Sequence, residues 1–125
     1  MVPENLKYTK DHEWVKIDGD IATIGITDHA QKQLGDITFV ELPEESVSVN
    51  AEDIFCTVES VKAASDVYAP ISGAVDSVNG DLEITPELIN QDPYDKGWIC
   101  RIKIADLEEV NNLMDSENYK KIIEG

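Results

Sequence analysis

The sequence predicts a mainly β fold, a sandwich or small barrel of short strands with short helices beside it. Three observations lead to this prediction. Short runs of β-branched and aromatic residues fill most of the chain. Glycine and proline separate these runs, and helical spacing of apolar residues dominates only near the C-terminus. Because no linker or repeat divides the 125 residues, we expect one domain over residues 1–125.

The first expected element is a β-hairpin. An apolar run over residues 14–17 leads to Asp18-Gly19, a dipeptide that favours the positive φ angles of a tight turn. The apolar run over residues 21–26 returns from this turn as the second strand.

A short helix is expected next, over residues 28–34. Thr27 can cap its N-terminus, and Gly35 tolerates the left-handed conformation that often ends a helix. Strands then resume over residues 37–42, 47–49, 54–61, 66–68, 73–78 and 97–104.

Three helical segments are expected in the second half of the chain. Pro86 has the fixed φ that suits the first position of a single helical turn over residues 86–89. Asp106 and Glu109 have the spacing of a capping box at the start of the next segment. Apolar residues recur at helical spacing in the last two segments, and we expect them to cover one end of the β core. They are Leu107, Val110, Leu113 and Met114 in the first and Tyr119, Ile122 and Ile123 in the second.

Acidic residues outnumber Lys and Arg by 26 to 10, which gives a formal net charge of −16 and a pI near 4.2. This charge argues against nucleic acid and anionic membranes as partners and favours basic protein surfaces and a monomeric state. No apolar run is long enough to span a membrane, and residues 1–15 resemble neither a signal nor a transit peptide. We therefore expect a bacterial cytoplasmic protein, or a mitochondrial matrix protein only if a transit peptide has been removed.

Two cysteines, Cys56 and Cys100, have neither disulfide-framework nor zinc spacing, and no metal site is expected at His12 or His29. Alternation along two predicted strands places the cysteines among apolar residues: Ile54, Cys56 and Val58 in one, and Trp98, Cys100, Ile102 and Ile104 in the other. Both thiols are expected to be buried. A thiol oxidoreductase with Cys56 as nucleophile ranks far behind, because nothing nearby would lower its pKa.

Lys62 is the one basic residue between Lys32 and Lys96, a stretch of 63 residues with 14 carboxylates. It follows one predicted strand, and the small side chains after it leave room for a large molecule to approach. A lone solvated lysine at a strand end is the ordinary interpretation. The alternative is an acceptor for covalent modification, acylated by a dedicated enzyme.

Motifs around and beyond Lys62 follow one another from residue 8 to about residue 104. The main blocks are Tyr8-Thr9, His12-Glu13-Trp14-Val15, Gly25-Ile26-Thr27, His29-Ala30-Gln31, Phe39-Val40-Glu41-Leu42-Pro43, Glu59-Ser60-Val61-Lys62-Ala63-Ala64-Ser65-Asp66, Pro86-Glu87-Leu88-Ile89-Asn90 and Gly97-Trp98. Together these blocks closely resemble the H-protein family of the glycine cleavage system.

The resemblance implies a β-sandwich of the lipoyl/biotinyl-carrier type, a barrel-sandwich hybrid with short flanking helices. It also implies lipoic acid in amide linkage to Lys62, within an attachment motif formed by Glu59, Ser60, Val61 and Ala63. Biotin carriers have Met on both sides of the acceptor lysine, and lipoyl domains of 2-oxo-acid dehydrogenases usually have Asp before it. Neither pattern occurs here.

The partners implied by the family are enzymes that act on the lipoyl arm. A PLP-dependent glycine decarboxylase loads an aminomethyl group, a tetrahydrofolate-dependent aminomethyltransferase removes it, and an FAD-containing dihydrolipoyl dehydrogenase reoxidises the arm. A lipoate ligase or an octanoyl/lipoyl transferase would attach it. The chain itself would be a non-catalytic carrier. The alternative role is a relay that donates lipoyl or octanoyl groups to other enzymes.

A carrier of a hydrolysable aminomethyl group needs a sheltered cleft with a carboxylate for the ammonium end. Glu13 and Asp66 are the predicted contacts, with plain solvated acids as the alternative, and His12 is expected to form hydrogen bonds near this cleft. The chain departs from the family pattern at several positions. Ala51-Glu52-Asp53 stands where a glycine is frequent, Glu44-Glu45-Ser46 replaces a glycine-containing turn, and Asp11 and Gln33 stand where Ser and His occur.

Overall fold

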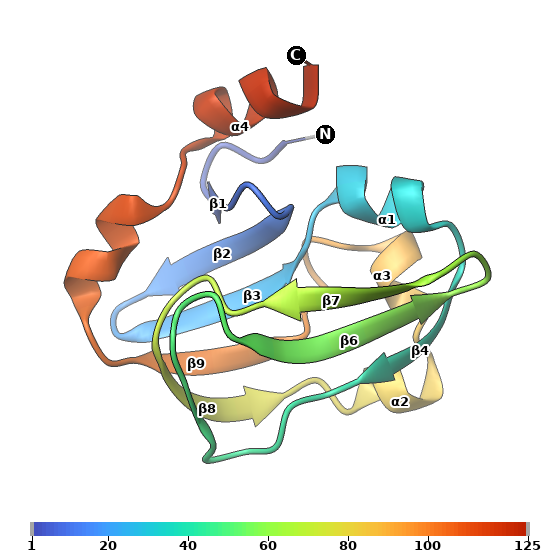
Figure 1. Ribbon diagram of the computed structural model, residues 1–125, viewed down its shortest axis with the longest axis horizontal. Coiled ribbons are helices and arrows are strands. Elements are labelled where there is room, and N and C mark those ends of the chain that lie inside the picture. The colour runs from blue at the N-terminus through green and yellow to red at the C-terminus, as the bar shows by residue number, and fades with distance from the viewer. Residues whose placement is uncertain (1, 125) are drawn as a thin grey trace.

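The computed structural model describes residues 2–124, and within them the chain forms two antiparallel sheets (Figure 1). The larger sheet has the order β1 (Lys7–Tyr8), β2 (Glu13–Asp18), β3 (Ile21–Ile26), β9 (Cys100–Ile104), β8 (Gly73–Val78) and β5 (Ser48–Val49). The smaller sheet has the order β4 (Ile37–Glu41), β6 (Ile54–Ser60) and β7 (Ala64–Tyr68). The predicted mainly β sandwich is confirmed.

The main apolar core lies between the two sheets. Val15 and Ile24 from the larger sheet are buried together with Val58 and Val67 from the smaller one. Each such side chain contributes roughly 1.5–3 kcal/mol when it is fully buried. The outer face of the smaller sheet has no helix over it in Figure 1, and Phe39 and Asp66 of this sheet are exposed.

Helix α1 (Asp28–Leu34) has the predicted bounds because both of its end signals are local. The Thr27 hydroxyl accepts a hydrogen bond from the Ala30 amide at 3.2 Å. Gly35 has φ +80° and donates its amide to the Gln31 carbonyl at 2.9 Å. The Asn90 side chain donates to the Gly35 carbonyl at 2.9 Å, which fixes the helix exit. Gly35 lies next to Lys62, so this anchoring also positions the candidate site.

The remaining helices are short. They are α2 (Asp81–Ile84), α3 (Leu88–Gln91), the 3₁₀ helix η1 (Leu107–Asn112) and α4 (Ser116–Glu124). Pro86 precedes α3, but a hydrogen-bonded turn already leads into the helix there, because the Leu88 and Ile89 amides donate to the Thr85 and Pro86 carbonyls. The expected helical segments after residue 106 are present, and the first of them has 3₁₀ rather than α geometry.

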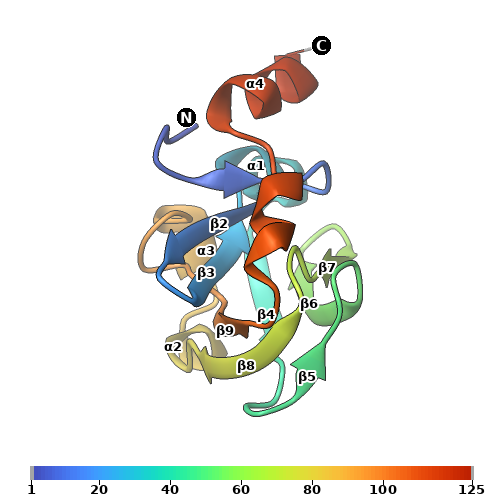
Figure 2. The same ribbon diagram turned by 90° about the vertical axis from the view of Figure 1, so that its left-hand side faces the viewer.

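The N-terminal strand and the C-terminal helix pack against each other at one end of the molecule (Figures 1 and 2). The rings of Tyr8 and Tyr119 stack with their centroids 4.7 Å apart. The backbones of Tyr8 and Met114 exchange two hydrogen bonds, each 2.8 Å long. The Tyr119 hydroxyl lies 2.7 Å from Thr27 Oγ1, so the last helix contacts the cap of α1.

Two of the side-chain placements predicted by alternation are wrong. Ile54 is 57% exposed, because the β6–β7 pairing is irregular between Ile54 and Cys56 and reverses the alternation there. Trp98 precedes β9 and packs in the outer cluster with Tyr8 and Trp14, away from Cys100. Cys56 and Cys100 are both buried, as predicted.

The predicted capping box is only half correct. The Asp106 side chain accepts a hydrogen bond from the Glu108 amide at 3.0 Å and so caps η1. The Glu109 carboxylate does not accept the Asp106 amide, which would complete the capping box. It accepts the Ser72 amide at 2.7 Å and the Ser72 hydroxyl at 3.0 Å, which ties η1 to the loop before β8. This long-range contact outcompetes the local one that the spacing predicted.

Candidate functional site: an exposed lysine and a nearby cavity

Lys62 lies at the tip of the β6–β7 hairpin, in a turn that is closed by its own hydrogen bonds. The Ser60 amide donates to the Ala63 carbonyl at 2.8 Å. The Ser60 hydroxyl oxygen accepts the amides of both Lys62 and Ala63, each at 3.2 Å. The next residue, Val61, donates its amide to the Asp36 carbonyl at 3.1 Å. The backbone under Lys62 is therefore fixed although the side chain is exposed.

The Lys62 ammonium group has no carboxylate within 4 Å among residues 2–124, and its side chain is exposed. Its stem passes over Gly35, where an added Cβ would lie 3.5 Å from Lys62 Cε. Glu59 and Val61 are exposed beside it, and Val61 is 67% exposed. An acyl group on this nitrogen would break no ion pair and displace no packed side chain, so the residues present fit such a group.

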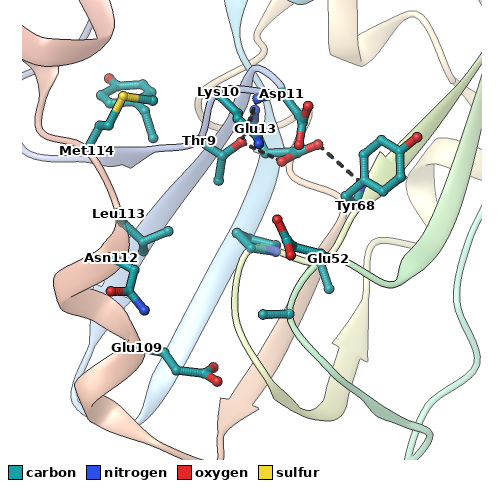
Figure 3. A pocket seen from close by; sticks show the side chains of 14 residues that line it. Thr9, Lys10, Asp11, Glu13, Glu52, Tyr68, Glu109, Asn112, Leu113 and Met114 are labelled. Atoms are coloured by element: carbon teal, nitrogen blue, oxygen red, sulfur yellow. Dashed lines mark hydrogen bonds between the residues drawn. The ribbon is translucent and has the colours of Figure 1, made fainter.

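A cavity of about 480 Å³ opens beyond the other end of β7 (Figure 3). Four separate segments of the described chain form its walls. The lining residues are Tyr8, Thr9, Lys10, Asp11 and Glu13, then Ala51 and Glu52, then Tyr68, Ala69 and Pro70, and finally Glu109, Asn112, Leu113 and Met114. Its lining combines apolar surface with several carboxylates, which suits a ligand with an apolar body and a cationic end.

Glu13 is the buried carboxylate of this cavity, at 2% exposure. The Thr9 hydroxyl donates to its Oε1 at 2.5 Å, and the Tyr68 amide donates to its Oε2 at 3.2 Å. Burial raises its pKa from 4.5 to about 7, although both hydrogen bonds favour the ionised form. Glu13 therefore changes its charge near neutral pH.

The Glu13→Gln variant is expected to gain stability relative to the parent protein as the pH rises from about 4.5 to about 7. Between these values the folded protein holds a proton on Glu13 that the unfolded chain has lost, so the contribution of Glu13 to stability falls as the pH rises. Glutamine does not titrate and lacks this loss. Urea unfolding of both proteins across the window should give a rising difference that levels off above pH 7.

The exposed Glu44→Gln variant, measured in parallel, is the control for the loss of one carboxylate. A difference between Glu13→Gln and the parent that stays flat over this pH range would contradict the raised pKa of Glu13.

The other two predicted cleft residues do not line the cavity. Asp66 is exposed on β7, opposite Thr57, between Lys62 and the cavity. His12 Nδ1 lies 2.8 Å from the Tyr119 hydroxyl oxygen, and the ring centroids of His12 and His29 are 4.7 Å apart. The pKa of His12 is lowered mainly by burial and to a smaller extent by repulsion from the neighbouring His29. The structure thus brings Glu13 to the cavity and leaves Asp66 and His12 outside it.

Sequence reasoning missed most of the cavity wall, including Glu52, Tyr68 and Glu109. These residues lie far apart along the chain and share no motif. For Glu52, the one available signal was its position in a turn where the resembling family often has glycine.

The described residues offer little other chemistry. Burial raises the pKa of the Cys56 thiol to about 12 and also raises that of Cys100. Among residues 2–124, no three His, Cys, Asp or Glu side chains gather as a metal site. No helix in this part of the chain is long and apolar enough to cross a membrane.

Comparisons with known proteins all point to one family. The family described as Glycine cleavage H-protein matches residues 6–125. The glycine cleavage system H protein of Halothermothrix orenii is 55% identical over 98% of this chain and 96% of its own length. That of Carboxydothermus hydrogenoformans is 52% identical over 99% of this chain and 95% of its own. The crystal structure of a glycine cleavage system H protein from Mycobacterium marinum has a TM-score of 0.88 at 36% identity, covering 96% of this chain and 97% of that one.

The two antiparallel sheets and the short flanking helices form a fold of the lipoyl-carrier type. This is the fold class that the resemblance implied. The chain belongs to the glycine cleavage H-protein family.

Proposed function

We propose that this protein carries lipoic acid as an amide on Lys62 and transports the aminomethyl group of glycine between the enzymes of the glycine cleavage system. The observation that carries the proposal is the exposed ammonium group of Lys62, unpaired among residues 2–124, on a turn that Ser60 holds rigid. A rigid turn presents the nitrogen to an attaching enzyme at a constant position. Ala63 is small and exposed, which lets that enzyme approach closely.

The reach of the modified side chain supports a link between Lys62 and the cavity. β7 runs from Ala64 to Tyr68 and spans about 13 Å at the usual rise per residue, and the arm starts two residues earlier, at Lys62 on the hairpin tip. A lysine extended by a lipoyl group reaches roughly 14 Å by standard bond lengths. Asp66 lies exposed on this path, and Tyr68 and Glu13 line the cavity at its far end. We infer that the arm can lie along β7 and bring its end to the mouth of the cavity.

The bound lipoyl group would supply a disulfide that takes up the aminomethyl group produced by the PLP-dependent decarboxylase. The residues of this chain orient the arm, exclude water from its end and place carboxylates around an amine. We infer that the protein is a non-catalytic carrier in one domain, residues 1–125. Its two thiols are buried, so they are poorly placed to take part in the exchange.

The proposed partners are the glycine decarboxylase, the folate-dependent aminomethyltransferase, the dihydrolipoyl dehydrogenase and the enzyme that attaches the arm. A net charge of −16 favours contact through basic surfaces on these enzymes and opposes self-association. We propose a cytoplasmic monomer.

The loading reaction tests this proposal. When lipoylated protein is mixed with glycine and a competent glycine decarboxylase, CO₂ should be released. Each protein molecule should gain one aminomethyl group, measured by intact mass. Unmodified protein is the control and should stay unchanged. If the lipoylated protein cannot be loaded, the proposed shuttle is wrong and the alternative role as a lipoyl donor to other enzymes gains support.

A further inference from the structure

Glu52 has a backbone conformation that is unusual for its residue type. Its φ is +76°, in the left-handed region that glycine adopts without steric cost. Two hydrogen bonds hold it there: its amide donates to the Ala69 carbonyl at 2.7 Å, and the Ala69 amide donates to the Asp53 carbonyl at 2.7 Å. Glycine would adopt this turn at a lower conformational cost, so local stability does not explain why the position carries a glutamate side chain.

The Glu52 side chain lines the cavity beside Tyr68 (Figure 3). Its backbone is bonded to Ala69, the residue after Tyr68, at the end of β7 where the proposed path of the arm enters the cavity. No hydrogen bond or ion pair to the Glu52 carboxylate occurs among residues 2–124, and the residue is exposed. The carboxylate is therefore available to a ligand that arrives along β7.

The other charged groups of the cavity are less suited to receive a cation. Both oxygens of Glu109 accept hydrogen bonds from Ser72, and both oxygens of Glu13 accept hydrogen bonds from protein donors. Lys10 would repel a cation. Asp11 belongs to the loop before β2, not to the β7 wall, and is the remaining competitor of Glu52.

We propose that Glu52 is a specificity-determining residue of the cavity, whose carboxylate binds the primary ammonium end of the cargo on the arm. The inference rests on the proposed function. It extends that function by assigning the cargo contact to a residue outside the family-derived pair of Glu13 and Asp66. Because Glu13 is buried and both of its oxygens accept hydrogen bonds from the protein, the exposed carboxylate of Glu52 is the more accessible partner for an ammonium group.

The test compares lipoylated parent, Glu52→Gln and Glu52→Gly proteins after loading with the aminomethyl group. The folate-dependent enzyme is left out, and the lifetime of the loaded form is measured by release of ammonia or formaldehyde. Loss of one partly exposed charge-assisted contact is expected to shorten the lifetime about three- to tenfold in both variants. Glu44→Gln is the matched control and should keep the parent lifetime.

Two further measurements separate recognition from a structural effect. Glu52→Gly should unfold at the denaturant concentration of the parent or above it, because glycine removes the strain at φ +76°. The ¹³C chemical shift of the Glu52 side-chain carboxyl should change when the amine-loaded protein is compared with the lipoylated protein alone.

Different failures would reject different statements. If the parent is loaded and the Glu52 variants match its lifetime, the role of Glu52 is wrong while the shuttle stands. A short lifetime in Asp11→Asn with a normal one in Glu52→Gln would assign the contact to Asp11 instead. If the parent cannot be loaded at all, the shuttle and the role of Glu52 are both rejected.

Discussion

Lys62→Arg is expected to abolish lipoylation completely. Arginine keeps the positive charge and the length of the side chain, but its guanidinium group stays protonated and delocalised and is a very poor acyl acceptor. The fold should be unaffected, because the Lys62 side chain is exposed and the turn is held by Ser60 and backbone groups. Co-expression with a lipoate ligase, followed by intact-mass measurement, should show one adduct on the parent and none on the variant.

Lys96→Arg is the matched control, since Lys96 is the next basic residue along the chain and is also exposed. It should carry the same single adduct as the parent. An adduct that persists in Lys62→Arg would show that attachment takes place elsewhere and would remove the basis of the proposed function.

Gly73→Ala is expected to lower the free energy of unfolding by about 3 kcal/mol or more, or to prevent folding. A Cβ at Gly73 would lie 2.1 Å from the Lys103 carbonyl oxygen and 2.6 Å from Ile102 Cγ2. The Lys103 oxygen belongs to the backbone of β9, directly beside β8, so it cannot move without separating two central strands. Denaturant unfolding of the parent and the variant measures the difference.

Gly80→Ala is the control for adding one methyl group. An added Cβ at Gly80 has no heavy atom within 4 Å, and its φ is −60°. This variant should unfold within about 0.5 kcal/mol of the parent. A similar small effect for Gly73→Ala would contradict the close approach of the Lys103 carbonyl oxygen to Gly73.

Features with local causes were predicted well from the sequence. The hairpin around Asp18-Gly19 forms as expected, and α1 has the predicted bounds because Thr27 and Gly35 act within one helical turn of its ends. Lys62 was singled out by its isolation among carboxylates, which is also visible within one stretch of sequence, and its role as the attachment site stays a prediction.

Features that depend on distant partners were not predicted. Strand β1 has only two residues and exists through pairing with Val15 and Trp14 and through a bridge between Tyr8 and Met114. Glu109 has the spacing of a local cap, but the Ser72 amide and hydroxyl form a better pair of donors. The cavity requires four segments to meet, so no single motif could indicate its walls.

The burial of both cysteines makes the proposed arm easy to count. Burial raises the pKa of Cys56 to about 12 and raises that of Cys100 as well, so the folded protein holds almost no reactive thiolate of its own. A water-soluble maleimide applied to folded, reduced protein would label the two sulfurs of the arm and leave the chain unlabelled. Under denaturing conditions the same reagent would add two further labels from the cysteines. The number of labels on the folded protein divided by these two gives the fraction of molecules that carry the arm.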